Sequence, residues 1–464
     1  MKKTISTEIL IVGSGAGGSA AAGALAAAGR KVMILEAGPR MDWPSGHGRN
    51  LEPSETGLAA FGRLQEEHLV WPSNEVAEPL GLGGAKVAHV LGGMLSLWTN
   101  NCPWPHPDEL PSRDDHSIWE EYLKRAKKLL NVQDDYWAGV RMDRLMEQIT
   151  RAVGPMPEGR GVRPMPVAAE PDGSKLRFSS HEDLLAPGLG GNLTILTDLA
   201  VCDVLHSAGR VSGVVAKSTI DHEIIEVAAD TVIVAAGTIG SAKILAGAGL
   251  DVGPALGRGI FDHAAFVSRV PLNSKILDDV PADDGNFTIW VPYSPEHPWH
   301  CQVCRFPGTP TPVVPDVPES STADIFTWLP VDINNGNQIS FSTEKLDKFG
   351  LPSVTGVLQL SEKDNIRAAR AISEHYTIAA SIGDFTNGWY PNLYKPGGST
   401  HLMGSCRMGY ENDGESVVNK NGRVWAYENL YVAGNAVLSR TNGGNPTMLC
   451  VAAALRTADA ILSH

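Results

Sequence analysis

A glycine-rich segment near the start of the chain constrains the fold more than any other feature. Residues 8–12 form a short apolar run, followed by Gly13-Ser-Gly15-Ala-Gly17-Gly18 and then by a stretch dominated by alanine. Apolar β-branched residues favour a strand, and alanine favours a helix. The segment therefore predicts a strand, a tight turn and a helix. In this arrangement Gly13 permits the turn, Gly15 admits a phosphate close to the backbone, and Gly18 lets helix and strand pack closely.

The continuation of this segment predicts a dinucleotide-binding unit. Residues 31–35 form a second apolar run, which ends at Glu36, 18 residues past Gly18. A carboxylate at this place can accept hydrogen bonds from a ribose diol, and the free N–H groups of the helix start can bind phosphates. An alternative stays open, because the same glycines could serve only packing in a non-catalytic binding protein that keeps a doubly wound fold.

Composition and charge narrow the class of protein. The chain has 464 residues, 43% of them hydrophobic, which suffices for two or three domains with large cores. Its 38 basic and 52 acidic residues give a net charge of −14. This balance argues against nucleic acid and anionic membranes as partners and allows a neutral or cationic substrate. The uncharged residues 9–29 belong to the glycine turn rather than to a signal peptide or membrane span, so a cytoplasmic location is predicted.

The cysteines indicate reduced structural thiols. The chain has six cysteines, and only Cys301 and Cys304 form a CxxC pair. Two thiols supply half of a zinc site, and no matching second pair lies nearby. No metal is therefore predicted.

The order of segments predicts an α/β fold: a Rossmann-like cofactor domain interrupted by an inserted α+β substrate-binding domain. Residues 230–237 form a strand that runs into a helix at a glycine, which makes a second turn suited to lie beside a nucleotide. Proline-rich loops and clustered aromatic residues follow. Residues 41–79 are expected to form a loop or lid. The cofactor domain is assigned residues 1–105, 171–263 and 397–464, with a lid segment at 106–170 and the substrate-binding domain at 264–396.

Two polar residues near the C-terminus indicate the chemistry. His401 lies in Ser-Thr-His-Leu-Met-Gly and Asn445 in Gly-Gly-Asn-Pro-Thr, 44 residues apart, with a strand-like run at 429–435 between them. Oxidation of an alcohol by hydride loss leaves positive character on the carbon unless the hydroxyl proton departs. A neutral imidazole can take that proton, and a carboxamide can hold the oxygen. In isolation, however, His401 could be a structural histidine, and Asn445 could serve only the conformation before Pro446.

The combined pattern resembles the glucose-methanol-choline family of flavin oxidoreductases. Within that family, residues 400–409 and 443–447 are most similar to pyranose oxidases and to bacterial sugar- and glycoside-oxidising relatives. The resemblance rests on five ordered blocks, which are residues 13–18 with Glu36, 92–100, 235–245, 257–263 and 401–447.

The resemblance implies FAD bound in an extended pose. Val201 would lie near the adenine, and Asn435 and Thr447 near the ribityl or isoalloxazine end, with His401 and Asn445 flanking the flavin N5. Leu97 occupies the position at which several pyranose oxidases carry a histidine bonded covalently to the flavin, so FAD is expected to be non-covalent. The full set of expected cofactor-binding residues is Gly13, Gly15, Gly18, Glu36, Gly92, Gly93, Trp98, Asn100, Val201, Ala236, Gly237, Asn435, Pro446 and Thr447.

The predicted function is therefore FAD-dependent oxidation of a hydroxyl on a sugar, glycoside or polyol, with a small-molecule alcohol as partner. The more specific alternative is an amino-sugar or aminoglycoside intermediate, attracted by the acids at 278, 279, 283 and 284 if these are more than solvated loop charges. A flavin reductase or hydroxylase fed by a nicotinamide would share the N-terminal fingerprint but would leave His401 and Asn445 unexplained. His263 is expected to be structural or near the cofactor, and His297 and His300 are pocket candidates. Oxygen or another molecule could be the electron acceptor, and the oligomeric state is open.

Overall fold

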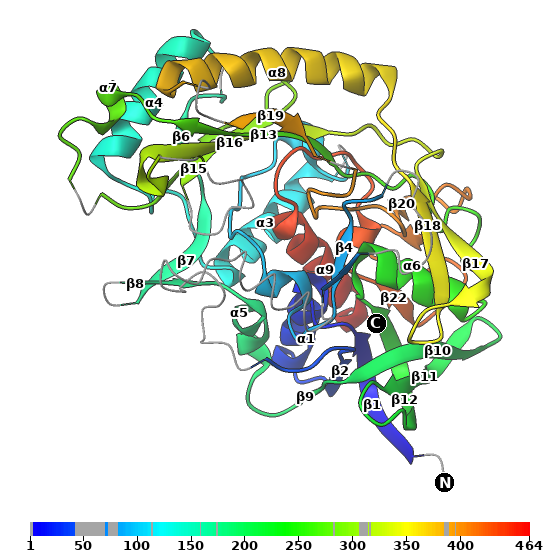
Figure 1. The fold of residues 1–464 in the computed structure, drawn as a ribbon. Coiled ribbons are helices and arrows are strands. Elements are labelled where there is room, and N and C mark those ends of the chain that lie inside the picture. Colours follow the sequence, from blue (N-terminus) through cyan, green and yellow to red (C-terminus); the bar gives the residue numbers. More distant parts are fainter. Residues whose placement is uncertain are drawn as a thin grey trace.

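Two large sheets organise the chain (Figure 1). The computed structural model describes residues 3–41, 70–72, 82–112, 115–157, 159–172, 175–281, 284–305, 314, 317–384, 389–394 and 396–464. Most of the expected lid at 41–79, together with Asp283, lies outside these residues. Among the helices within these ranges, each is too short or too polar to span a lipid bilayer.

The first sheet is the expected doubly wound core. Five parallel strands lie in the order β9 (Leu193–Leu196), β2 (Val32–Leu35), β1 (Lys3–Val12), β12 (Ile224–Val234) and β22 (Leu430–Val432). The antiparallel strand β11 (Arg210–Ser218) pairs with the first half of β12, and β10 (Leu199–Ser207) pairs with β11. All four residues of β2 are buried, as expected for a parallel strand covered on both faces.

Helices built from small or amphipathic sequences cover this sheet. The strand, turn and helix predicted around Gly13 are present, since β1 leads into α1 (Ala16–Ala27). Helix α1 packs against α9 (Thr447–Leu462), which in turn packs against α3 (His116–Leu129). In α3 the buried residues are Trp119, Leu123 and Ala126, which form one apolar stripe at helical spacing. The helix predicted at the second glycine turn is α6 (Gly237–Gly247).

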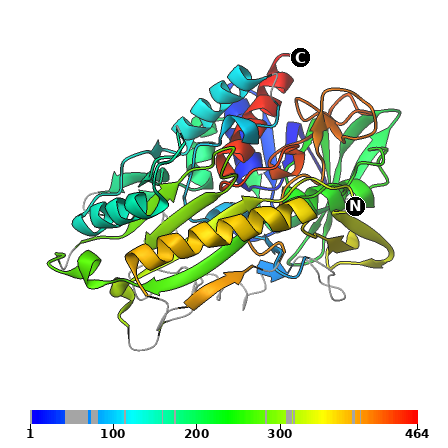
Figure 2. The same cartoon turned by 90° about the horizontal axis from the view of Figure 1, so that it is seen from above.

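The second sheet is antiparallel and is built mostly from the inserted segment. Its order is β19 (Trp389–Leu393), β13 (His263–Pro271), β16 (Thr322–Pro330), β15 (His300–Arg305), β14 (Phe287–Val291) and β6 (Arg163–Pro164). Helix α8 (Glu362–Ile382) crosses one face of this sheet, and α4 (Val140–Val153) packs against α8 (Figures 1 and 2). Ser361 and Asp364 close a capping box at the start of α8.

Strand alternation gives the antiparallel sheet two different faces. On β16, Thr327 bonds to His375 of α8, whereas Phe326 and Trp328 line a cavity on the opposite side. Successive side chains of a strand point to opposite faces, so a single strand both anchors α8 and builds a cavity wall.

Part of the inserted segment packs on the cofactor side. The hairpin of β17 (Gln338–Leu346) and β18 (Pro352–Val357) contacts α6, and Phe341 and Leu351 join the core of the parallel sheet. The predicted boundaries of the five segments therefore stay predictions.

The short elements that complete the described chain are β3 (Val70–Pro72), β4 (Lys86–Ala88), β5 (Val132–Gln133), β7 (Val167–Asp172), β8 (Lys175–Phe178), α5 (His181–Leu185), α7 (Ser274–Leu277), β20 (Met408–Gly409), β21 (Val418–Asn419), η1 (Gly93–Ser96), η2 (Pro107–Glu109), η3 (Ala186–Gly188), η4 (Glu319–Ser321) and η5 (Asn435–Val437).

Candidate active site

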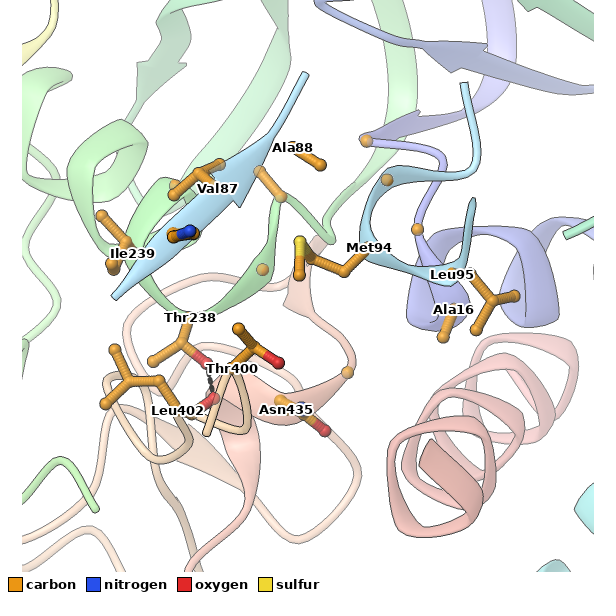
Figure 3. A pocket seen from close by; sticks show the side chains of 18 of the residues that line it. Ala16, Val87, Ala88, Met94, Leu95, Thr238, Ile239, Thr400, Leu402 and Asn435 are labelled. Carbon is orange, nitrogen blue, oxygen red and sulfur yellow. Dashed lines mark hydrogen bonds between the residues drawn. The ribbon is translucent and has the colours of Figure 1, made fainter. Parts of the chain in front are cut away.

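A cavity of about 1080 Å³ connects the glycine turn to the C-terminal pair. Residues of both sheets line it. In Figure 3 Leu95 and Ala16 lie on one side of it, and Val87 and Ile239 lie on the other. Eleven of the expected cofactor-binding residues line the cavity, namely Gly13, Gly15, Glu36, Gly93, Trp98, Val201, Ala236, Gly237, Asn435, Pro446 and Thr447, and so do His401 and Asn445.

The glycine turn has the geometry that its sequence predicts. Gly13 has φ of +97°, and a Cβ there would lie 2.7 Å from the carbonyl oxygen of Ala235. A Cβ on Gly18 would lie 2.0 Å from the carbonyl oxygen of Gly13, so only glycine allows this approach of helix and strand. Gly15 faces the cavity, and a Cβ there would meet no protein atom within 4 Å. The cavity thus reaches the backbone at Gly15, as phosphate binding requires.

Glu36 belongs to a polar network that joins three separate segments. Its carboxylate accepts hydrogen bonds from Ser14 N (3.0 Å), Ser14 Oγ (2.6 Å) and Gly38 N (3.0 Å). The N–H of Gly92 donates to Ser14 Oγ at 2.8 Å. Burial raises the pKa of Glu36, and the hydrogen bonds from Ser14 and Gly38 oppose this rise. The network fixes the Glu36 carboxylate at the cavity. Sequence reasoning missed Ser14 as a member of this network.

Some residues of the 92–100 block line the cavity, and others form hydrogen bonds that hold the cavity wall in place. Gly93 and Trp98 line the cavity, as does Leu97. Trp98 Nε1 donates to the carbonyl oxygen of Ser179 at 2.9 Å. Asn100, with φ of +57°, donates from its amide to the carbonyl oxygens of Ala168 and Ser179. Of the expected cofactor-binding residues, Gly18, Gly92 and Asn100 do not line the cavity, and the contacts described for them lie within the protein.

Two helix starts and an unpaired amide oxygen fit a large polar ligand. Helices α6 and α9 begin at Gly237 and Thr447, both on the cavity wall, so their positive ends face it. Within the described part of the chain, the buried Asn435 Oδ1 has no hydrogen-bond partner. Together with the exposed backbone at Gly15, these groups offer hydrogen-bond donors and acceptors to a dinucleotide.

The structure brings His401 and Asn445 together. Asn445 Nδ2 lies 3.4 Å from His401 Nε2. Gln302 Nε2 donates to Asn445 Oδ1 at 2.6 Å, which orients the Asn445 amide with its N–H groups toward His401. Gln302 also lines the cavity. Sequence reasoning missed Gln302, although strand alternation over 300–305 would have placed it on the same face as Cys304, another cavity residue.

A strained turn carries His401. Thr400 has φ of +62°, which is unfavourable for a β-branched residue. Ser399 Oγ accepts from His401 N at 3.0 Å and donates to the buried carboxylate of Asp262. Thr238 Oγ1 donates to the carbonyl oxygen of Leu402 at 2.6 Å (Figure 3). Contacts on both sides of His401 therefore hold the strained conformation. Burial raises the pKa of Asp262 to about 6.

Two more histidines, His263 and His300, lie close to His401 and to the loop of Asn445. His263 Nδ1 lies 3.2 Å from His401 Nδ1. His300 Nε2 lies 3.1 Å from Glu109 Oε1, and the same oxygen accepts from Gly443 N in the loop before Asn445. Burial lowers the pKa of His401 to about 4, so its imidazole is neutral near pH 7 and can accept a proton. His263, His297 and His300 are not on the cavity wall.

The described members of the predicted acidic cluster, Asp278, Asp279 and Asp284, do not line the cavity. Asp278 and Asp279 are exposed and do not line it. Asp284 accepts from Arg141 N at 3.1 Å and pairs with its guanidinium at 3.7 Å. The carboxylates that line the described cavity are those of Glu36 and of Asp347, which is paired with Lys243.

The cysteines provide no second functional site. All six are free, and Cys304 lines the cavity, whereas Cys301 bonds to Thr327 on the face toward α8. Over the described ranges, no group of three or more His, Cys, Asp or Glu residues could hold a metal ion.

The fold and the cavity define a dinucleotide-binding protein whose cavity wall holds an imidazole and a carboxamide side by side. The chain belongs to the GMC oxidoreductase family, which matches residues 139–265 and 335–454, and residues 11–60 match the NAD(P)-binding Rossmann-like domain. GMC oxidoreductases bind FAD and oxidise alcohols, so this chain is an FAD-dependent alcohol oxidoreductase, as its sequence predicts. The non-catalytic alternative is set aside.

Relatives of known activity cover nearly the whole chain. C-glycoside 3-oxidase of Microbacterium trichothecenolyticum is 28% identical over 97% of this chain and 95% of the relative. Pyranose 2-oxidase of Tricholoma matsutake is 26% identical, over 89% and 78% of the two chains. The crystal structure of pyridoxine 4-oxidase from Mesorbium loti has the same fold, with a TM-score of 0.72, 19% identity and 99% coverage of both chains.

Proposed function

We propose that this chain oxidises a hydroxyl group of a neutral sugar, glycoside or related polyol to the carbonyl, with His401 as base and Asn445 as clamp. The observation that carries the proposal is the 3.4 Å contact between Asn445 Nδ2 and His401 Nε2 on the wall of the cavity. The relatives named C-glycoside 3-oxidase and pyranose 2-oxidase support a sugar hydroxyl as the reacting group.

The two side chains divide the work on the hydroxyl. His401 Nε2 takes the hydroxyl proton, and the O–H electron pair stays on the oxygen. The Asn445 N–H donates to that oxygen and stabilises the negative charge that develops there. FAD, when bound, supplies the hydride acceptor. Leu97 on the cavity wall has no atom that could form a histidine-type bond to the flavin, so we propose that FAD is held non-covalently.

The aromatic wall beside His401 suits the face of a sugar ring. Phe326 and Trp328 stack with centroids 5.5 Å apart and planes at 4°, and the Trp328 centroid lies 5.5 Å from that of His401. Tyr394 packs on the edge of Trp328. Pockets for neutral polyhydroxylated ligands combine such walls with a few oriented polar groups, here those of Gln302 and Asn445.

The amino-sugar alternative gains no support from the acidic cluster. A cationic amine is stabilised by a carboxylate at close range, and Asp278 and Asp279 lie outside the cavity wall. We therefore favour a neutral substrate. Oxygen is the proposed electron acceptor by analogy with the oxidase relatives, and the cytoplasmic location stays a prediction.

Replacement of the two residues tests the proposal. His401→Ala should retain FAD but slow anaerobic flavin reduction by a sugar or glycoside between about 10²-fold and 10⁴-fold, because the base is lost. Asn445→Ala should cost less, about 10²-fold, because one hydrogen-bond donor is lost. His297→Ala, a partly exposed histidine away from the cavity, serves as the matched control and should reduce at the wild-type rate. Wild-type reduction by His401→Ala would reject the assignment of the base.

A further inference from the structure

Five side chains form one directional chain of hydrogen bonds through the reactive end of the cavity. Asn101 Nδ2 donates to Gln302 Oε1 at 3.4 Å, and Gln302 Nε2 donates to Asn445 Oδ1 at 2.6 Å. Asn445 Nδ2 faces His401 Nε2 at 3.4 Å, and His401 Nδ1 faces His263 Nδ1 at 3.2 Å. The carboxamides of Gln302 and Asn445 therefore each accept on one side and donate on the other.

This order favours one placement of the protons of the two histidines, although that placement leaves the buried His263 Nε2–H without a hydrogen-bond partner among the described residues. An amide nitrogen carries only donors, so His401 Nε2 must present its lone pair to Asn445. A neutral imidazole carries one proton, which places the proton of His401 on Nδ1. That N–H can then donate only if His263 Nδ1 is unprotonated, and His263 must carry its own proton on Nε2. The opposite arrangement would set two donors against each other at His401 Nε2.

The surroundings of His263 keep it neutral. The residue is 3% exposed, and burial lowers its pKa well below the ordinary value, with His401 and His300 lowering it further. Titratable groups come close to it from the 399–401 turn with His401 and from β15 with His300, and Asp262, which precedes β13, accepts from the His263 backbone N–H. The Glu109 carboxylate is bonded to His300 and to Gly443.

We propose that His263 is a positioning residue that fixes the tautomer of His401, so that Nε2 faces the substrate hydroxyl without a proton. This inference rests on the proposed role of His401 as the base. During the reaction the hydroxyl proton bonds to His401 Nε2, and the Nδ1 proton stays hydrogen-bonded to His263. His263 gains no proton in this step and stabilises the cationic ring as an acceptor.

The main experiment measures the tautomer directly by ¹⁵N NMR of histidine in the FAD-loaded protein near pH 7, with His401→Ala used to assign the resonances. We expect His401 to show a protonated Nδ1 and a bare Nε2. A protonated Nε2 on His401 in the wild type would overturn the proposal without any variant of His263.

Two variants of His263 test its effect on the reaction. His263→Leu removes the acceptor and should give a mixture of His401 tautomers. Anaerobic flavin reduction at saturating sugar should slow about 10²-fold, which is less than the largest rate loss caused by a wrongly protonated catalytic imidazole. His263→Asn keeps an acceptor oxygen and should restore most of the rate and the wild-type tautomer. Unchanged tautomer and rate in folded His263→Leu would overturn the proposal.

A control separates positioning from structural damage. His375→Leu removes another buried histidine, which bonds to Ser268 and Thr327 under α8. It should lower thermal stability but leave the His401 tautomer unchanged. If His401→Ala itself reduced at the wild-type rate, the proposed function would fail, whereas the NMR result would still decide whether His263 sets the tautomer.

Discussion

One wall of the cavity is lined mainly by backbone, and the other is lined mainly by side chains. The wall from the parallel sheet presents backbone at Gly15, Gly93 and Gly237 and the starts of α1, α6 and α9. The wall from the antiparallel sheet presents side chains such as Gln302 and Trp328. The cofactor side should therefore tolerate little added volume, whereas the reactive side should be sensitive to donor and acceptor order rather than to volume.

The largest effect is expected at the glycine turn that supports the backbone wall. Gly18→Ala places a Cβ 2.0 Å from the Gly13 carbonyl oxygen, so strand and helix must separate at the turn. We expect purified protein without flavin and with a lower melting temperature. Flavin absorbance and thermal unfolding measure the two effects.

Gly15→Ala is the matched variant, because its Cβ meets no protein atom within 4 Å and faces the cavity. It should fold with near wild-type thermal stability in the absence of flavin and should bind FAD more weakly. Full flavin content and stability in Gly18→Ala would show that the turn behind the backbone wall tolerates added volume after all.

The next effect concerns pH and the reactive wall. Burial lowers the pKa of His401 to about 4, so the neutral base form prevails above that pH. The rate of anaerobic flavin reduction should therefore be level near neutral pH and fall as pH drops through about 4, roughly tenfold per pH unit. Stopped-flow reduction across this range checks the sign. A rate that rises as pH falls would contradict a neutral imidazole base.

A smaller effect is expected at Gln302. Gln302→Leu removes the donor to Asn445 Oδ1, so the Asn445 amide can rotate and present its oxygen to His401. Flavin content should stay at the wild-type level, and reduction should slow about tenfold, the cost of about one hydrogen bond. Stopped-flow reduction at saturating sugar measures the loss. A wild-type rate would show that Asn445 keeps its orientation without Gln302.

The smallest effect is expected from the exposed acids. Asp278→Asn and Asp279→Asn change charges that lie off the cavity wall. The ratio of reduction rates with a neutral sugar and with its amino analogue should change by less than about twofold, since exposed charges act weakly. A selective loss with the amino sugar would revive the cationic alternative.

Local patterns in the sequence predict the backbone wall well. The roles of Gly13 and Gly18 follow from a turn of a few residues, in which spacing and backbone conformation decide the structure together. The helix at Gly237 is predictable for the same reason. The pairing of His401 and Asn445 is predicted from the chemistry of the two side chains together with the family resemblance, because two residues 44 positions apart carry no spacing rule of their own.

The reactive wall depends on contacts that only the folded chain creates. Gln302 meets Asn445 across 143 residues, and His263 meets His401 across 138. Each of these contacts requires the antiparallel sheet to dock on the C-terminal loops, which no local propensity encodes. The acids at 278 and 279 show the converse, because a charge cluster obvious in the sequence lies on an exposed loop away from the site.

The most direct test of the account is an anaerobic titration of the FAD-loaded protein with neutral sugars and glycosides, amino sugars, simple alcohols and NADPH, followed by the flavin spectrum. The account predicts that a neutral sugar or glycoside bleaches the flavin fastest. NADPH as the fastest reductant, or no bleaching by any sugar or glycoside, would contradict it.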